Sequence, residues 1–349
     1  MKHITFVIGG MTRGGAERVI SILANYYAAE DWNVDIVMLL NNTVNYDLNS
    51  NINLIDMTVD SGSRIKSAPK WVTLFRKYIK ENKPDVIVSF VARINIVVLL
   101  ATLGMKIPVI ISERNDPAAD GRSKIINIAT KIIYRKAKTI VFQTERARNY
   151  FTGKIKKNGV IIPNPIAVTC IAEKSKKKIV SVGRLAPQKN QQLLIAAFKK
   201  VLNKHPDYVL YIYGDGELKE QLERQVACLG IKDKVFMPGN KPNIHQEISD
   251  AELFVLSSDY EGLSNAMLEA MMMGFPCIST NCAGADEYIM SGENGILVPL
   301  QDKDSMVNAM NYMIENKERA LEMGKNAQKS VENCQVEVVM KEWNKIIEF

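Results

Sequence analysis

The sequence predicts an α/β protein made of two doubly wound parallel sheets, one after the other. Its 349 residues are too many for one ordinary core, while 47% hydrophobic and 24% charged residues are typical of a globular chain. Short apolar runs alternate with segments of helical periodicity, which favours parallel strands joined by helices. The alternation starts again after Pro163 and Pro165, so we expect a stiff domain junction there.

The first domain, expected over residues 1–166, begins with an apolar run, a glycine loop and the helical segment "AERVISILANYYAAED". Further compact apolar runs follow, each bounded by polar or helical segments, and they predict strands. In chain order the predicted strands are "HITFVIGG", "NVDIVMLL", "DVIVSF", "PVIIS" and "TIVFQT". The segment "GVIIPNPI" then leads to the junction.

The second domain, expected over residues 167–330, repeats this pattern. Its predicted strands are "KKIVSVGR", "YVLYIYGDG", "VFMPG", "LFVLSS", "PCISTN" and "GILVP", and helical segments lie between most of them. The closing segment, residues 331–349, has apolar residues at helical spacing, namely Val338, Trp343, Ile346 and Ile347. We therefore expect a terminal amphipathic helix.

The charge of the chain is unevenly distributed. Residues 1–166 contain 24 basic and 13 acidic residues, a net of +11, whereas the remainder has a net of −4. A basic half attracts nucleic acid, an anionic membrane surface or a phosphorylated substrate, and charge alone does not choose among them. Aromatic residues are only 7% of the chain and are not interleaved with basic ones, so we expect no nucleic-acid partner.

The composition and the apolar runs also indicate the cellular compartment of the chain and whether it holds a metal site. The longest apolar run, residues 96–105, is shorter than the roughly 20 residues that span a bilayer. The N-terminal apolar run has no small-residue cleavage site, so we expect a cytoplasmic chain. The five cysteines form no C-x-x-C pair, and the three histidines have no zinc spacing. We expect structural thiols and no metal site.

Glycine and cation loops follow several predicted strands, where sheets of this type bind ligands. Gly14 and Gly15 begin the first helix, where free amides and the helix dipole favour an anion. The loop matches neither a Walker motif nor G-x-G-x-x-G. Asp35 stands at the front of its strand, so a dinucleotide site is not favoured. A tight turn without a ligand would explain the same glycines.

Two loops of the second domain have the chemistry of a diphosphate site. Arg184 and Lys189 follow one strand, and a guanidinium fork with a compact ammonium suits a diphosphate. The glycine loop with Gly214 and Gly216 follows the next strand. A plain surface loop and a plain turn are the alternatives.

The segment "EGLSNAMLE" places two carboxylates around a helix start. Ser264 is a plausible N-cap and Gly274 stops the helix, which we predict over residues 265–273. Glu261 then precedes the helix, and Glu269 is buried among apolar residues where a carboxylate needs a partner. The three groups match the parts of a nucleotide sugar in order. Glu261 suits the sugar hydroxyls, the helix start suits the diphosphate, and Glu269 suits the ribose hydroxyls. A structural Glu269 satisfied by backbone is the alternative.

These motifs together resemble the retaining glycosyltransferases of family 4, which have the GT-B fold. The resemblance rests on "GGAER", "GRL" with a following lysine, "GDGE" and E-x7-E after a strand, which occur in this order over nearly the whole chain. It implies two Rossmann-like domains facing across a cleft, with the acceptor domain first and the terminal helix crossing back onto it. "GGAERV" and "ISERNDP" are most similar to bacterial enzymes that add N-acetylgalactosamine or related hexoses to lipid-linked oligosaccharides or to capsule and exopolysaccharide precursors.

The resemblance also assigns roles to single residues. It implies that Arg184 and Lys189 neutralise the departing diphosphate, that Glu261 holds the donor sugar and that Glu269 binds the ribose. The nucleotide-sugar site would further include the loop and helix-start residues Gly14, Gly15, Gly214, Gly216, Gly239, Asn240, Lys241, Gly262, Leu263, Ser264 and Asn265. The family implies no metal cofactor and a front-face displacement. We expect a UDP-sugar donor and a polyprenyl-diphosphate-linked acceptor.

The chain departs from the family in one loop. Many relatives carry a histidine near the donor sugar after a strand of the first domain, where this chain has "SERNDP" with Arg114. Arg114 could contact the donor, the acceptor phosphate or Glu113, and Asp116 shares this ambiguity.

The segment "SKIINIATKIIYRKAK", residues 123–138, predicts a helix with a cationic face. Lys124, Lys131, Arg135 and Lys138 share one face, and Ile125, Ile128, Ala129 and Ile132 form an adjacent apolar stripe that we expect to pack inward. The cations could meet anionic headgroups or the acceptor's diphosphate, at the inner face of the cell membrane. A solvated helix face would explain them equally well.

Two functions of other classes use the same features. A nucleotide-sugar-binding regulatory module would have these loops but no acceptor site, and a nucleic-acid binder would explain the basic half. Transfer or slow hydrolysis of a nucleotide sugar separates the first from an enzyme, and salt-dependent duplex binding would indicate the second.

Overall fold

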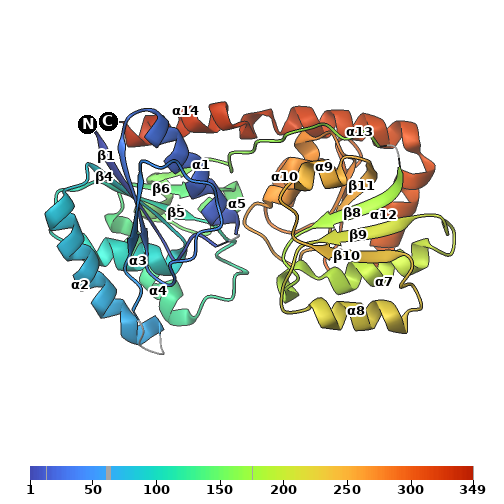
Figure 1. Ribbon diagram of the computed structural model, residues 1–349, viewed down its shortest axis with the longest axis horizontal. Coiled ribbons are helices and arrows are strands. Elements are labelled where there is room, and N and C mark those ends of the chain that lie inside the picture. Colours follow the sequence, from blue (N-terminus) through green and yellow to red (C-terminus); the bar gives the residue numbers. More distant parts are fainter. Residues whose placement is uncertain (13, 60–63, 175, 349) are drawn as a thin grey trace. The chain divides into compact units, whose positions relative to one another are not determined.

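The computed structural model describes residues 1–12, 14–59, 64–174 and 176–348. The chain divides into two compact units: Met1–Pro165 with Glu337–Phe349, and Ile166–Val336 (Figure 1). The expected junctions after residues 166 and 330 lie one and six residues from these boundaries. The terminal helix belongs to the first unit.

The first unit contains a seven-stranded sheet in the order β3-β2-β1-β4-β5-β6-β7, with every pair parallel. The strands are β1 (His3–Ile8), β2 (Asn33–Met38), β3 (Ile52–Asp56), β4 (Val86–Phe90), β5 (Val109–Glu113), β6 (Thr139–Phe142) and β7 (Gly159–Ile161). The sequence predicted neither β3 nor β7. Both are edge strands: the side chains of β3 are mostly exposed, and β7 is only three residues long, so neither has the long apolar run that marks the others.

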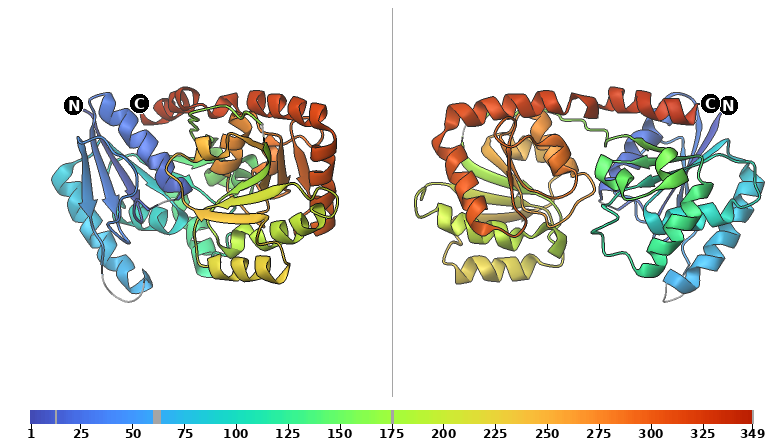
Figure 2. Two further views of the ribbon diagram at one scale, coloured as in Figure 1. Left: turned by 45° about the vertical axis from the view of Figure 1, so that its right-hand side comes forward. Right: turned by 180° about the vertical axis from the view of Figure 1, so that it is seen from behind.

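Helices cover both faces of this sheet (Figure 2). They are α1 (Gly15–Ala29), α2 (Arg64–Asn82), α3 (Ala92–Ala101), α4 (Lys124–Ile133), the 3₁₀ turn η1 (Tyr134–Lys136), α5 (Glu145–Asn149), α6 (Gly153–Lys157) and α14 (Val336–Ile347). Val7 packs in the same core cluster as residues of α2 and α3. The ring of Phe6, the neighbouring residue on β1, lies 6.4 Å from that of Tyr27 on α1. Successive side chains of β1 therefore point to opposite faces of the sheet, and each face packs against helices.

Helix α14 packs on the first unit through an aromatic contact. The rings of Trp343 and Phe90 are stacked with centroids 6.1 Å apart, and Trp343 is fully buried. The hydroxyl of Tyr27 also donates to Asn344 at 2.7 Å. Of the predicted apolar face, Trp343 and Ile347 are buried, whereas the prediction for Val338 was wrong, because this residue is exposed. The buried residues of α14 are Val339, Met340, Trp343 and Ile347.

The second unit has a six-stranded parallel sheet in the order β10-β9-β8-β11-β12-β13. Its strands are β8 (Lys176–Val182), β9 (Val209–Tyr213), β10 (Val235–Gly239), β11 (Ala251–Leu256), β12 (Cys277–Thr280) and β13 (Ile296–Val298). Its helices are η2 (Pro187–Lys189), α7 (Gln191–Val201), α8 (Lys219–Cys228), α9 (Ile244–Ile248), α10 (Asn265–Met272), α11 (Ala285–Tyr288), α12 (Lys303–Glu315), α13 (Lys317–Ser330) and η3 (Glu332–Cys334). All six predicted strands are present.

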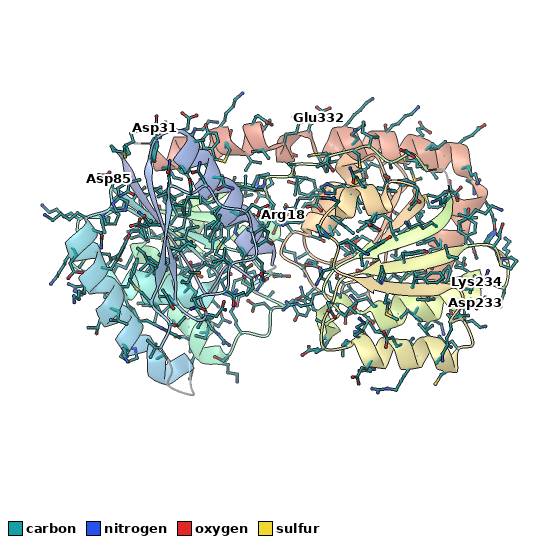
Figure 3. The ribbon with its side chains drawn as sticks, viewed as in Figure 1. Arg18, Asp31, Asp85, Asp233, Lys234 and Glu332 are labelled. Atoms are coloured by element: carbon teal, nitrogen blue, oxygen red, sulfur yellow. The ribbon has the colours of Figure 1, made fainter. Side chains whose placement is uncertain are left out.

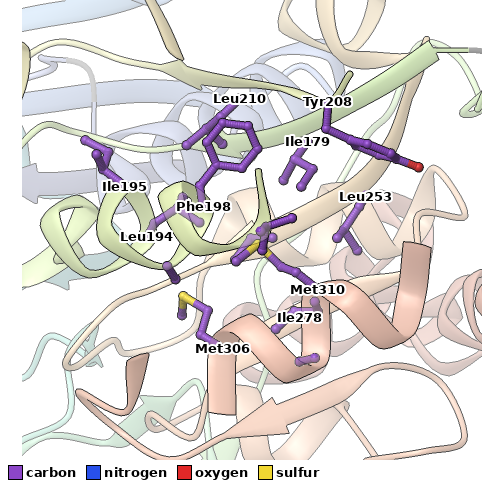
Figure 4. Packing of buried hydrophobic residues seen from close by; sticks show 14 of the residues in the cluster. Ile179, Leu194, Ile195, Phe198, Tyr208, Leu210, Leu253, Ile278, Met306 and Met310 are labelled. Atoms are coloured by element: carbon purple, nitrogen blue, oxygen red, sulfur yellow. The ribbon is translucent and has the colours of Figure 1, made fainter. Parts of the chain in front are cut away.

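The larger core of this unit lies between the sheet, α7 and α12. Phe198 of α7 and Met310 of α12 meet side chains from the central strands, including Ile179, Leu210 and Leu253 (Figure 4). Burial of such side chains stabilises the unit by roughly 1.5–3 kcal/mol each. The core fixes the sheet, and the sheet positions the loops at its edge.

Both sheets reverse their winding direction at one place, between β1 and β4 and between β8 and β11. Ligands of doubly wound sheets bind beyond the carboxyl ends of the strands at this switch point. In the second unit, the loops that leave the switch point are those carrying Lys189 and Glu261. Among the described residues, no helix has both the length and the apolarity to cross a bilayer.

Candidate active site

A cation and a carboxylate meet at the switch point of the second unit. The ammonium of Lys189 donates to Oε1 of Glu261, and Oγ of Ser258 donates to the same oxygen at 2.7 Å. The side chains of Lys189 and Glu261 are only 18% and 9% exposed. Burial and, second, the Glu261 charge raise the pKa of the Cys282 thiol to about 12. The pair therefore lies in a partly desolvated site, where charges act strongly.

Hydrogen bonds between the two loops hold this pair in place. Oγ of Ser257 donates to the carbonyl of Lys189 at 2.8 Å, and the amide N–H of Asp259 donates to the carbonyl of Gln188 at 2.9 Å. Nε2 of Gln188 donates to the carbonyl of Tyr260 at 2.8 Å and lies 3.4 Å from Oε2 of Glu261. Gln188 is a site residue that the sequence reasoning missed.

The glycine loop after β9 packs directly on the loop after β8. A Cβ on Gly214, whose φ is +137°, would lie 2.0 Å from the carbonyl oxygen of Gly183, and a Cβ on Gly216 would lie 2.3 Å from that of Leu185. The amide N–H of Leu185 donates to the carbonyl of Asp215 at 2.9 Å. Both glycines are needed for this close approach of backbones, whatever ligand the loops bind.

Helix α10 begins at Asn265, as predicted, and ends at Met272, one residue before the predicted end. Oγ of Ser264 accepts from the amide of Met267 at 3.4 Å, which confirms the N-cap. Gly262, Leu263 and Ser264 are buried at the helix start, where the helix dipole favours negative charge.

The second carboxylate, Glu269, is buried in α10 and faces a histidine. Oε2 of Glu269 lies 3.4 Å from Nε2 of His245, which comes from α9. The side chains are 6% and 8% exposed. No local pattern in the sequence indicates His245, because it precedes Glu269 by a helix, a strand and a loop.

The remaining candidates of this unit are more exposed. Arg184 follows β8 with an exposed side chain, and its backbone carbonyl accepts from Nε2 of Gln191 at 2.9 Å. Gly239, at φ +78°, ends β10, and Asn240 and Lys241 are exposed beyond it. All lie at the carboxyl edge of the same sheet, with the Lys189–Glu261 pair.

In the first unit, Gly14 and Gly15 begin α1 as expected, with Gly14 as the N-cap. A Cβ on Gly14 would lie 2.3 Å from Oε2 of Glu17, so a carboxylate of the first helical turn already covers this helix start. The carbonyl of Gly14 accepts from the hydroxyl of Tyr46 at 2.8 Å.

Asp35 is part of a buried network at the opposite edge of the first sheet. Its Oδ2 lies 2.8 Å from Nε2 of His3 and accepts from the hydroxyl of Tyr78. Asp85, labelled in Figure 3, accepts from the backbone N–H of His3 at 2.7 Å. These contacts tie strand starts together, and they place Asp35 near the front of β2, as the sequence indicated.

Glu113, the last residue of β5, and Arg114, which follows it, have different partners. Arg122 donates to both carboxylate oxygens of Glu113 at 3.1 and 3.2 Å, and the hydroxyl of Tyr134 donates at 3.0 Å. Burial raises the pKa of Glu113, while Arg122 opposes the shift. Arg122 also binds Asp120 at 2.7 Å. Glu113 is therefore paired within the unit, through a residue that the sequence reasoning did not single out.

Arg114 does not bind Glu113. Its Nη1 donates to Oδ1 of Asn164 at 2.8 Å, and its guanidinium lies 4.4 Å from the ring centroid of Phe90. Nε and Nη2 have no hydrogen-bond partner in the described part of the chain, and burial lowers the pKa of Arg114 to about 9. Asp116, also buried, pairs with Arg146 at 3.3 Å.

The predicted helix over residues 123–138 needs two corrections. Helix α4 ends at Ile133 and continues only as η1, so Lys138, which precedes β6, is not on its face. The expected inward stripe points to solvent, because Ile125, Ile128 and Ile132 are 77%, 59% and 58% exposed. Thr130 is buried instead, with Ile126 and Ile133 partly buried. These three share a row at spacings of four and three, which is the row that packs.

Within the described residues, no group of three or more histidine, cysteine or acidic residues has the arrangement of a metal site.

Two family models match almost the whole chain. Residues 171–330 match the model described as glycosyl transferases group 1, and residues 13–169 match glycosyltransferase family 4. A Haemophilus influenzae protein described as an uncharacterized glycosyltransferase is 28% identical over 355 residues, covering 99% of this chain and 100% of its own.

A second relative has a named activity. The Campylobacter jejuni GalNAc-alpha-(1->4)-GalNAc-alpha-(1->3)-diNAcBac-PP-undecaprenol alpha-1,4-N-acetyl-D-galactosaminyltransferase is 27% identical over 359 residues, covering 99% of this chain and 98% of its own. The crystal structure of Anabaena HepE in complex with UDP and glucose covers 100% of both chains with a TM-score of 0.83 at 18% identity. At that identity the likeness is one of fold.

Proposed function

The chain belongs to the glycosyltransferases of group 1 and family 4, and we propose that it moves a hexose or N-acetylhexosamine from a UDP-sugar to a lipid-linked saccharide. Its two Rossmann-like units are those of the GT-B fold. The observation that carries the proposal is the partly buried Lys189–Glu261 pair at the switch point. It joins a cation for a diphosphate to an acceptor for sugar hydroxyls.

The other loop residues complete a donor site in the second unit. Arg184 and Lys189 balance the negative charge that develops on the departing diphosphate. The N-terminus of α10 adds the positive end of its dipole, and Glu269, further along the helix, accepts from ribose hydroxyls. Because these groups supply the electrostatic stabilisation, we propose that transfer needs no metal ion.

We propose that the anomeric configuration is retained. The acceptor hydroxyl approaches the anomeric carbon from the face that the diphosphate leaves, the C1–O bond to phosphate breaks and a C1–O bond to the acceptor forms. The departing phosphate oxygen takes the proton of the acceptor hydroxyl, so the step neither releases a proton to solvent nor takes one from it. The named activity of the Campylobacter relative and the UDP bound to HepE support the classes of acceptor and donor.

Helix α4 supports a lipid-linked acceptor at a membrane surface. Ile125, Ile128 and Ile132 form an exposed ridge, and Lys124 and Lys131 are exposed on the same short helix. Apolar side chains flanked by cations suit the boundary between acyl chains and anionic headgroups. We propose that the ridge enters an anionic membrane surface, which places the enzyme peripherally at the inner face of the cell membrane. An exposed apolar row of this kind is otherwise unfavourable in a soluble domain.

Incubation with UDP-sugars and an undecaprenyl-diphosphate-linked saccharide tests the proposal. We expect release of UDP together with a lengthened glycan, whose new linkage keeps the donor's anomeric configuration by NMR. A chain that binds UDP-sugars but transfers to no lipid-linked acceptor would instead be a regulatory binding module.

A further inference from the structure

Glu269 lies against a histidine whose protonation pattern can be read from its neighbours. Nδ1 of His245 lies 3.3 Å from the backbone nitrogen of Thr169 and 3.4 Å from its Oγ1. A backbone N–H can only donate, so Nδ1 acts as the acceptor. The ring proton then lies on Nε2, and this is the atom that faces Oε2 of Glu269 at 3.4 Å.

We propose that His245 is a positioning residue for nucleotide binding. It holds one carboxylate oxygen of Glu269 so that the group is oriented toward the ribose before the nucleotide arrives. The inference rests on the proposed role of Glu269 and adds a residue that the family motifs do not include.

The physical reason lies in the burial of both side chains. His245 and Glu269 are each less than a tenth exposed, and a buried carboxylate without a donor is costly. Nε2 of His245 has no hydrogen-bond partner among the described residues, and the Glu269 carboxylate at 3.4 Å is the acceptor that its N–H faces. Thr169 fixes the ring from behind, so the imidazole cannot turn away. A carboxylate held in one orientation loses less conformational freedom when it binds a ligand.

The inference predicts a particular kinetic signature. Glu269 would contact the ribose equally in the ground state and the transition state, because the ribose does not react. Loss of its positioning should therefore raise the KM for the UDP-sugar while kcat stays nearly constant. A histidine that only fills the core would lower stability without this split.

Two variants of His245 whose side chains differ in length provide the test. A glutamine at this position can carry an N–H to the place of Nε2, whereas an asparagine ends near the place of Nδ1. We expect His245→Gln to bind UDP close to the parent and His245→Asn to bind about tenfold more weakly, the scale of losing one buried polar contact. Isothermal titration calorimetry with UDP and thermal unfolding are measured on the full-length chain.

A double variant shows whether the effect passes through Glu269. On a Glu269→Gln background, His245→Asn should weaken UDP binding no further, because the two changes act on one interaction. His205→Asn is the matched control. His205 makes a similar contact with Glu315, 3.1 Å between Nε2 and Oε1, but it precedes β9 and so lies at the opposite edge of the sheet.

Equal UDP affinity of the Gln and Asn variants would overturn the inference. So would an Asn variant whose loss persists on the Glu269→Gln background, since His245 would then act as a core residue. The proposed function fails in a different way, namely if the parent binds no nucleoside diphosphate or if Glu269→Gln binds UDP as tightly as the parent.

Discussion

Lys189 and Glu261 form a partly buried ion pair although 72 residues separate them in the chain. Their loops are neighbours because β8 and β11 are adjacent at the switch point of the sheet. Ser258 and Gln188 contribute further donors to the same carboxylate. The proposed donor site is thus held in place by hydrogen bonds within the second unit itself.

Removal of one partner from this pair should cost stability. Lys189→Met leaves Glu261 buried without its cation, and we expect the free energy of unfolding to fall by about 3 kcal/mol. Lys189→Met combined with Glu261→Gln should recover part of that loss, because no charge is then left buried. Urea unfolding of the parent, both single variants and the double variant measures the coupling. Strictly additive effects would show that the two residues do not interact.

Arg184→Ala should lower turnover without lowering stability. The side chain is exposed, so its loss leaves no cavity, whereas its charge matches the departing diphosphate. We expect kcat to fall by about 10²-fold, the scale for removal of one stabilising group. Arg224→Ala, which removes an exposed side chain of α8, is the control and should retain full activity. An Arg184→Ala variant with parental kcat would remove Arg184 from the mechanism.

Glu269→Gln should weaken nucleotide binding while the fold stays intact. An amide presents one acceptor oxygen to the ribose hydroxyls where the carboxylate presents two. A loss of about tenfold in UDP affinity is expected, equal to roughly 1.4 kcal/mol. Isothermal titration calorimetry measures the UDP affinity of the variant and the parent, and thermal unfolding measures their stability. Unchanged affinity with a large fall in melting temperature would identify Glu269 as structural.

Sugar transfer should persist in excess EDTA. Arg184, Lys189 and the start of α10 supply the positive potential that a metal ion supplies in other sites. We expect rates with EDTA and with added magnesium to agree within about twofold, a difference that corresponds to less than 1 kcal/mol. Loss of transfer in EDTA, with recovery on addition of magnesium, would contradict the proposed metal-free mechanism.

Two sets of changes, on α4 and on the adjoining turn η1, should reduce membrane binding. Replacement of Ile125, Ile128 and Ile132 by Gln removes the exposed ridge, and Lys131→Glu with Arg135→Glu reverses two cations, each worth about 1 kcal/mol near an anionic surface. Both variants should sediment less with anionic liposomes and lose activity on the lipid acceptor, yet bind UDP normally. Leu321→Gln, an exposed residue of α13, is the control. Parental sedimentation of both variants would exclude α4 as the contact.

The sequence by itself determined the elements and their chemistry. Apolar runs identified the strands except the two edge strands of the first sheet, β3, which is mostly exposed, and β7, which has only three residues. Ser264 marked the start of α10 correctly, because an N-cap acts within one turn. The loops with Arg184, Lys189 and Glu261 were found because glycines and charges directly after a buried strand are local features.

Only the tertiary structure decided which of these residues meet. The Lys189–Glu261 pair depends on β8 lying next to β11, and the Glu269–His245 contact depends on how α9 packs beside α10. Helix α4 shows the same limit, since periodicity placed its isoleucines in a row but could not tell which row is buried. Local spacing fixes which side chains share a face, whereas burial and pairing depend on neighbours that are distant in the chain.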